Sequence, residues 1–255
     1  MTLMQLFLIS FLAISYGKLI TLNPKIVGGR NAKPGEIAYQ VSLQTIKTGH
    51  HFCGGVVLNQ KYVLTAAHCV FGKNVKLISA TVGTIDLRKP HAVYLIESSY
   101  VHEEYNRNNS WINDIALLKL ISPIEFSTLV SPVELPKQNQ TVKTDSTAIV
   151  SGYGRLRYNG NRTNELNVAS IKIADQAYCR DMYAKHSKNI FNTHICANEP
   201  TVERGSCKGD SGGPLTVDGK LIGLVSWSHH CSDMVFPSVY TRVPSYVNWI
   251  REYAV

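Results

Sequence analysis

The feature that most limits the fold is a series of short apolar runs, each broken after a few residues by Gly, Pro, Asn or Asp. Short apolar runs bounded by turn-forming residues are typical of β-strands. Many short strands joined by polar turns indicate an all-β sandwich or barrel. The predicted strands are 41–44, 55–58, 76–82, 92–98, 115–120, 146–151, 168–173, 213–217 and 220–227.

The end of the chain departs from this pattern and predicts one helix. Pro244 suits the first turn of a helix, because its fixed φ is already helical and its missing N–H has no partner there. Val243, Val247 and Ile250 then fall on one face, which is the spacing of an amphipathic helix. Beside them stand Tyr246, Trp249 and Tyr253. This stripe predicts a helix packed on the protein rather than a binding face.

The charge and the size of the chain bound its partners. The sequence has 255 residues and a formal net charge of +8, with Lys and Arg scattered singly. A length of this order is enough for one or two buried cores. No basic helix or stacking motif accompanies the charge, so we expect an ordinary solvated surface and no nucleic-acid partner.

The first 17 residues are typical of a signal peptide. They contain an apolar run between Leu6 and Ile14, no charged side chain, and the small residues Ser15 and Gly17 near the end. Such a run is too short for an ordinary membrane span. We expect cleavage near Gly17 and a secreted, extracellular product that has no membrane partner; the alternative is a short N-terminal anchor.

Secretion affects how the cysteines and the glycosylation sequons are interpreted. An even count in an oxidising compartment predicts three disulfides, and six cysteines allow 15 pairings. The chain lacks the Cys-x-x-Cys spacing of a zinc site, so we expect no metal. The cysteines are Cys53, Cys69, Cys179, Cys196, Cys207 and Cys231. The sequon asparagines, which are glycosylation candidates, are Asn108, Asn139 and Asn161.

Three short segments carry the chemistry. Their sequences are LTAAHC at 64–69, NDIALL at 113–118 and GDSGGP at 209–214. A serine hydroxyl needs a base within hydrogen-bond reach, and the base needs an orienting partner. Histidine suits the base, because its pKa lies near the operating pH. Glycines around a serine allow a tight turn that exposes the hydroxyl and aims backbone N–H groups at one point.

With these three segments in this order, the chain from 26 to 255 resembles the trypsin/chymotrypsin family, most closely its invertebrate chymotrypsin-like enzymes. The resemblance implies two antiparallel β-barrels, with the active site between them and a C-terminal helix. It implies His68 as general base and acid, Asp114 as its orienting partner and Ser211 as nucleophile. The oxyanion hole would consist of the N–H groups of Gly209 and Ser211. The implied activity is endopeptidase hydrolysis of proteins or peptides by a monomer, without a cofactor.

The resemblance also implies a zymogen. Residues 25–29 (KIVGG) are similar to the family's activation site. Cleavage after Lys25 by a trypsin-like protease would remove the propeptide 18–25 and free the amine of Ile26. That amine would pair with Asp210, beside the nucleophile, and a buried ion pair of this kind can act as a switch. The mature protease domain is then 26–255, a target for protein inhibitors.

The family pattern further assigns the disulfides and the substrate site. The implied pairs are Cys53–Cys69, Cys179–Cys196 and Cys207–Cys231. The implied substrate-binding residues are Gly205, Ser206, Lys208, Ser226, Trp227, Ser228 and Ser238. In trypsins an acid lies at the pocket floor, but here Gly205 occupies that position. We therefore expect chymotrypsin-like to elastase-like cleavage. The side chains of Ser228 and Ser238 should narrow the pocket. Asp233 is the one acid near enough to favour a basic residue before the cleaved bond.

Two further features leave alternatives open. Residues 226–228 resemble the family's strand that pairs with the substrate backbone, and His229 and His230 follow it. We expect these two histidines to be exposed and merely polar, and the alternative is a pH-sensitive rim. No third ligand is near them in sequence, which argues against a metal site. For the whole chain, one rival is a catalytically inactive homologue that binds or regulates. Another is a basic protein that binds anionic surfaces without turnover.

Overall fold

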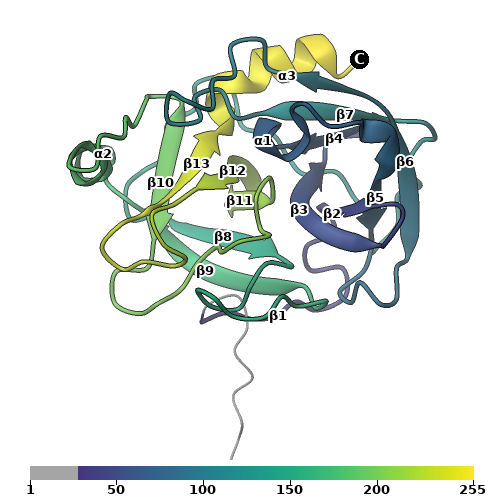
Figure 1. Cartoon of the computed structure of the whole chain (residues 1–255), viewed down its shortest axis with the longest axis horizontal. Helices are drawn as coiled ribbons and strands as arrows, with labels where there is room; N and C mark the ends of the chain where they lie inside the picture. Colours follow the sequence, from purple (N-terminus) through teal and green to yellow (C-terminus); the bar gives the residue numbers. More distant parts are fainter. Residues whose placement is uncertain (1–27) are drawn as a thin grey trace, which may run out of the picture.

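The computed structural model describes residues 28–255. Two β-barrels lie side by side (Figure 1), the N-terminal one drawn in purple and blue and the C-terminal one in green and yellow. All strand pairs within both barrels are antiparallel. This confirms the predicted fold class of two antiparallel barrels with a C-terminal helix. The predicted signal peptide, the propeptide, Lys25 and Ile26 lie outside the described residues.

The N-terminal barrel closes in the order β2-β3-β4-β7-β6-β5. It closes because β2 pairs with β3 on one side and with β5 on the other. Its apolar side chains alternate inward and form one core. The strands are β2 (Gln40–Thr45), β3 (His50–Val57), β4 (Tyr62–Thr65), β5 (Ile78–Val82), β6 (Ala92–Val101) and β7 (Ala116–Leu120).

The C-terminal barrel has the strand order β9-β10-β13-β12-β11-β8. Pairing of β8 with β9 closes it, and β1 (Arg30–Asn31) is added to the outer side of β9. The strands are β8 (Thr147–Gly152), β9 (Asn167–Ile173), β10 (His194–Asn198), β11 (Pro214–Val217), β12 (Lys220–Trp227) and β13 (Ser238–Arg242).

Helices are few and short. They are α1 (Ala67–Val70), α2 (Gln176–Ala184) and α3 (Val247–Tyr253), with 3-10 turns η1 (Val75–Leu77) and η2 (Val243–Tyr246). No helix within 28–255 is long and apolar enough to cross a membrane. The predicted C-terminal helix begins later than expected, because the segment that contains Pro244 forms the 3-10 turn η2 and α3 follows it.

A third core joins the two barrels. It combines Leu64 and Leu117 of the N-terminal barrel with Leu224 of the C-terminal barrel, and α3 covers it with Trp249 and Ile250. Figure 1 shows α3 lying across the top of both barrels. Because this core is shared, the barrels are held in one relative position, which fixes the groups that meet between them.

The structure forms the three disulfides that the family resemblance implies. They join Cys53 to Cys69, Cys179 to Cys196 and Cys207 to Cys231. The first connects β3 to α1 and so anchors the short helix that carries His68.

Candidate active site

His68 and Asp114 meet in the N-terminal barrel. His68 lies in α1, directly after β4, and Asp114 precedes β7, the partner of β4. Nδ1 of His68 donates to Oδ2 of Asp114 at 2.7 Å, and the backbone N–H of His68 donates to Oδ1 at 2.8 Å. The carboxylate can only accept, so Nδ1 carries the ring proton. Nε2 is thereby left with its lone pair, as a base requires.

The C-terminal barrel supports the same carboxylate. The side chain of Asp114 is fully buried. The hydroxyl of Ser226 in β12 donates to Oδ2 at 2.5 Å, and Thr241 in β13 donates to the backbone carbonyl of Asp114 at 2.7 Å. A buried carboxylate is stable only where donors surround it. Asp114 therefore depends on both barrels for its position.

Ser211 occupies a tight turn at the boundary between the barrels. Its carbonyl accepts from the N–H of Gly54 in β3 at 2.7 Å, and the N–H of Gly212 donates to Val225 in β12 at 2.7 Å. Gly212 has a φ of +77°, and a Cβ there would lie 2.2 Å from the hydroxyl of Thr65. Only glycine fits this place. Among the hydrogen bonds of residues 28–255, none uses the N–H of Gly209 or of Ser211.

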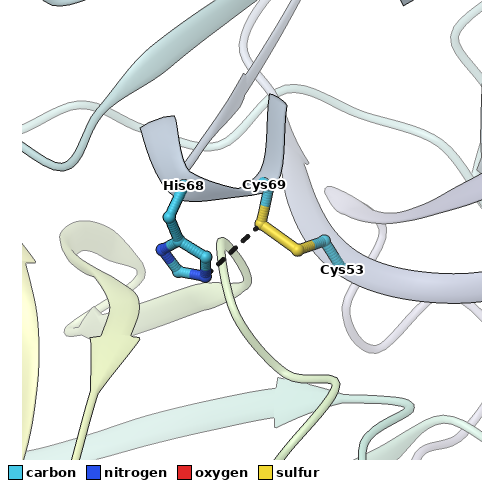
Figure 2. A group of neighbouring side chains, drawn as sticks. All are labelled: Cys53, His68 and Cys69. Carbon is cyan, nitrogen blue, oxygen red and sulfur yellow. Dashed lines mark hydrogen bonds between the residues drawn. A yellow bond between two sulfur atoms is a disulfide. The ribbon is translucent and has the colours of Figure 1, made fainter. Parts of the chain in front are cut away.

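The disulfide sulfur of Cys69 lies between His68 and Ser211. Sγ of Cys69 is 3.8 Å from Nε2 of His68, as Figure 2 shows, and 3.6 Å from the carbonyl oxygen of Ser211. His68 and Ser211 are thus neighbours. Within the described part of the chain, no hydrogen bond joins Nε2 to the Ser211 hydroxyl, a contact that often tightens only when substrate binds.

Cys53, His68 and Cys69 also bring three metal-ligand atoms within 4.8 Å of one another. Metal binding needs the thiolate form of cysteine. Both sulfurs are consumed in the Cys53–Cys69 disulfide (Figure 2), so this group does not form a metal site.

Asp210 is buried beneath the Ser211 turn. Its carboxylate accepts from the N–H groups of Gly154 at 2.8 Å and Cys207 at 2.9 Å. Burial raises the pKa of Asp210 to about 6, and the two N–H donors oppose that rise. A Cβ at Gly154 would lie 2.6 Å from the carboxylate. Among the described residues, only backbone N–H groups therefore stabilise the charge of the Asp210 carboxylate.

Sequence reasoning missed His51, which fixes the segment before the serine. Its Nε2 lies 2.9 Å from the carbonyl oxygen of Gly209, and its Nδ1 lies 2.8 Å from the hydroxyl of Ser42. The carbonyl can only accept, so Nε2 carries the proton and Nδ1 accepts from Ser42. Burial lowers the pKa of His51 to about 4, so the ring is neutral at physiological pH. No local motif marks this role, because the partners are far apart in sequence.

A cavity of about 250 Å³ opens beside Ser211. Of the predicted substrate-binding residues, five line it: Ser206, Lys208, Ser226, Trp227 and Ser228. Gly205 and Ser238 lie outside its lining. None of the described residues that line it is acidic. The carboxylate of Asp233 accepts from the N–H groups of Val235 and Phe236 in its own turn.

Two tryptophans form one wall of this cavity. The ring of Trp111 stacks on Trp227 with centroids 5.7 Å apart. Trp111 has a φ of +52°, in a segment where Ser110 and Asn113 also have positive φ. Such backbone is strained for residues other than glycine. Trp111 was not predicted, because its segment shows no periodic pattern.

Comparison with known proteins agrees with this geometry. The family profile described as Trypsin matches residues 26–250. The chain is 40% identical over 227 residues to "Chymotrypsin-2" of Vespa crabro, which covers 89% of this chain and 99% of that protein. It is 36% identical over 242 residues to "Trypsin-1" of Astacus astacus, and this match covers 90% of this chain and 100% of that protein. The solved structure of mouse neuropsin, a serine protease, superimposes with a TM-score of 0.80 at 32% identity, covering 89% of this chain and 99% of the other. The chain therefore belongs to the trypsin family of serine endopeptidases, which act on proteins or peptides.

Proposed function

We propose that this chain is a secreted endopeptidase made as a zymogen, with His68, Asp114 and Ser211 as its catalytic residues and a preference for an apolar residue before the cleaved bond. The observation that carries the mechanism is the buried carboxylate of Asp114, 2.7 Å from Nδ1 of His68, on the same side of the molecule as Ser211. It supports the assignment because a base oriented in this way is what a serine nucleophile needs.

The proposed reaction has two stages. Oγ of Ser211 attacks the substrate carbonyl carbon while its proton moves to Nε2 of His68. The C–N bond then breaks, Nε2 gives that proton to the departing amine, and an ester on Ser211 remains. In the second stage, water gives a proton to Nε2 and attacks the ester carbon. The ester C–O bond then breaks, and Nε2 returns a proton to Oγ of Ser211. Asp114 stabilises the imidazolium in each stage.

The unused N–H groups of Gly209 and Ser211 support an oxyanion hole. Both lie in the same turn, and neither has a hydrogen-bond partner within residues 28–255. Two preorganised donors at the developing negative charge lower the barrier more than the same donors in water. The contact of His51 with the carbonyl of Gly209 holds this peptide in place.

Asp210 supports the proposed activation. Its buried carboxylate has N–H donors but no cationic partner among the described residues. In the proposal, cleavage after Lys25 by a trypsin-like protease frees the amine of Ile26, which enters the fold and supplies the positive charge. The pair would then order the turn that presents Gly209 and Ser211.

The cavity lining supports the proposed specificity. A Lys or Arg side chain in a cavity without an acid would be buried unpaired, which costs several kcal/mol. An apolar side chain instead gains roughly 25 cal/mol per Å² buried. The hydroxyl of Ser228 lies on the wall and reduces the space for the largest rings. We therefore propose Phe, Tyr, Leu, Met and smaller residues as the preferred class.

The proposed specificity is tested by steady-state kinetics of the processed enzyme. The peptide substrates are matched and differ only in the residue before the cleaved bond. We expect kcat/KM for Leu and Phe to exceed that for Lys and Arg. Ser228→Gly should raise kcat/KM for Phe relative to Leu by roughly tenfold, since it frees the volume of a CH2OH group. Ser211→Ala is the control for contaminating protease and should show no turnover. A higher kcat/KM for Arg would reject the apolar preference and assign specificity to Asp233.

A further inference from the structure

We propose that His186, His229 and His230 form a binding site for a divalent transition-metal cation, such as Zn²⁺, at the mouth of the substrate cavity. His229 and His230 adjoin each other in sequence, but the third residue is 43 positions earlier. The sequence therefore gives no sign of it. The fold brings the turn after α2 against the segment after β12 and so places His186 next to His229.

One residue, Tyr183, fixes the spacing of the two segments. The backbone N–H of His186 donates to the carbonyl of Tyr183 at 3.0 Å, and the backbone N–H of His229 donates to the Tyr183 hydroxyl at 3.3 Å. Tyr183 itself is buried. The ring of Phe236 lies against both histidines, with centroid distances of 5.1 Å to His186 and 4.8 Å to His229. The two imidazoles thus stand on a rigid base.

Two of the three ring pairs have separations near those of a metal site. The centroids of His186 and His229 are 4.9 Å apart, and those of His229 and His230 are 4.3 Å apart. Two imidazoles bound to one tetrahedral zinc, with Zn–N bonds of about 2.0–2.1 Å, have centroids roughly 5 Å apart. A bend at His229 and His230 allows both rings to share a side.

The nitrogens of the three rings are available for coordination. All three histidines are exposed, and no ring nitrogen among them takes part in a hydrogen bond within residues 28–255. The nitrogens are not yet gathered within ligand distance, since the described chain has only one group that is, at Cys53. The proposal therefore requires the imidazoles to change rotamer about χ1 and χ2 so that their nitrogens converge.

The charged side chains near the three histidines each contact another group. Lys188 lies over the Trp111 ring at 5.2 Å, and Lys208 lies over the Tyr158 ring at 5.8 Å. Asp233 points its carboxylate to backbone N–H groups of its own turn. Imidazole ligands favour zinc, copper or nickel over calcium or magnesium, because the harder cations need oxygen ligands.

A cation held here would inhibit the enzyme. His229 and His230 line the same cavity as Ser228, on the segment that continues the strand to which the substrate is proposed to pair. Occupation of this rim obstructs the approach of a peptide.

The first test measures inhibition of the processed enzyme by Zn²⁺ at pH 7.5, with a small peptide substrate. We expect His186→Ala to retain the activity of the parent enzyme without metal. The Zn²⁺ concentration for half inhibition should rise at least tenfold, since even loss of a residue that merely orients a ligand costs about 10–100-fold in affinity. His91→Ala, which removes an exposed histidine of the N-terminal barrel, is the matched control and should leave inhibition unchanged.

The second test measures binding without turnover. Co²⁺ is added to the Ser211→Ala enzyme and the visible absorption of tetrahedral cobalt is recorded. We expect the signal to saturate, and to be lost in Ser211→Ala/His186→Ala/His229→Ala but kept in Ser211→Ala/His91→Ala. Equal cobalt binding or equal zinc inhibition with and without His186 would overturn the proposal. Neither outcome depends on the proposed specificity.

Discussion

At the residue scale, the buried carboxylate of Asp210 makes stability depend on pH. Its folded pKa of about 6 lies above the ordinary value of 3.8. The carboxyl therefore contributes stability below pH 4, and this contribution is lost as the pH rises through 6. Above pH 6 the ionised group costs the precursor about 3 kcal/mol.

Asp210→Asn should remove this pH dependence of stability in the precursor and abolish activity after processing. In a Lys25→Gln background, we expect the stability of the variant relative to its parent to rise by up to about 3 kcal/mol between pH 4 and pH 7.5, because only the parent carries the titrating carboxyl. In the processed enzyme the same change leaves the proposed amine buried without a partner, which destabilises the active form. Urea unfolding at the two pH values measures the first effect. An equal loss of stability at both values would contradict it.

The proposed catalytic residues could be picked out because short motifs surround them, whereas the residues that support them could not. His68, Asp114 and Ser211 each lie in a recognisable segment, and the structure brings the first two into contact. Thr241 and His51 act through contacts across more than 100 residues of chain. Such contacts depend on strand pairing in space, which a pattern of nearby residues does not report.

At the element scale, α3 is the cover of the core that joins the barrels. Ile250 is 1% exposed within that core, and its neighbour Arg251 is exposed. Ile250→Ala should lower the free energy of unfolding by about 2–5 kcal/mol, because it removes buried methyl groups and leaves a cavity. Arg251→Ala should change it by no more than about 0.5 kcal/mol. Denaturant unfolding of both in the Ser211→Ala enzyme avoids self-digestion, and equal values would show that α3 does not hold the core.

Most strands were predicted from their apolar runs, but β1, β4, β10 and β13 were not. The expected strand 220–227 coincides with β12, but 76–82 begins late, because Asn74 caps the 3-10 turn η1. β4 has only four residues, and β13 mixes polar and apolar ones. Both are strands because neighbours pair with them on each side. α2 went unpredicted although Asp175 caps it, since only two of its side chains are buried.

At the scale of the whole molecule, the proposed zymogen predicts a change of activity on a single cleavage. Trypsin treatment of the precursor should expose an N-terminus beginning Ile-Val-Gly-Gly and raise activity by orders of magnitude, because the turn at Ser211 then gains its ion pair. Lys25→Gln should stay inactive under the same treatment. N-terminal sequencing beside a peptidase assay measures both, and a fully active Lys25→Gln precursor would disprove the switch.

The division of the site between two barrels also sets an order in time. The N-terminal barrel is complete by Leu120, so a ribosome that makes the chain can release a closed barrel carrying His68 and Asp114 while Ser211 is still unsynthesised. Among the described elements α3 emerges last, and it seals the joint between the halves. A chain that stops before Ser211 therefore carries the proposed base and its orienting carboxylate without the proposed nucleophile.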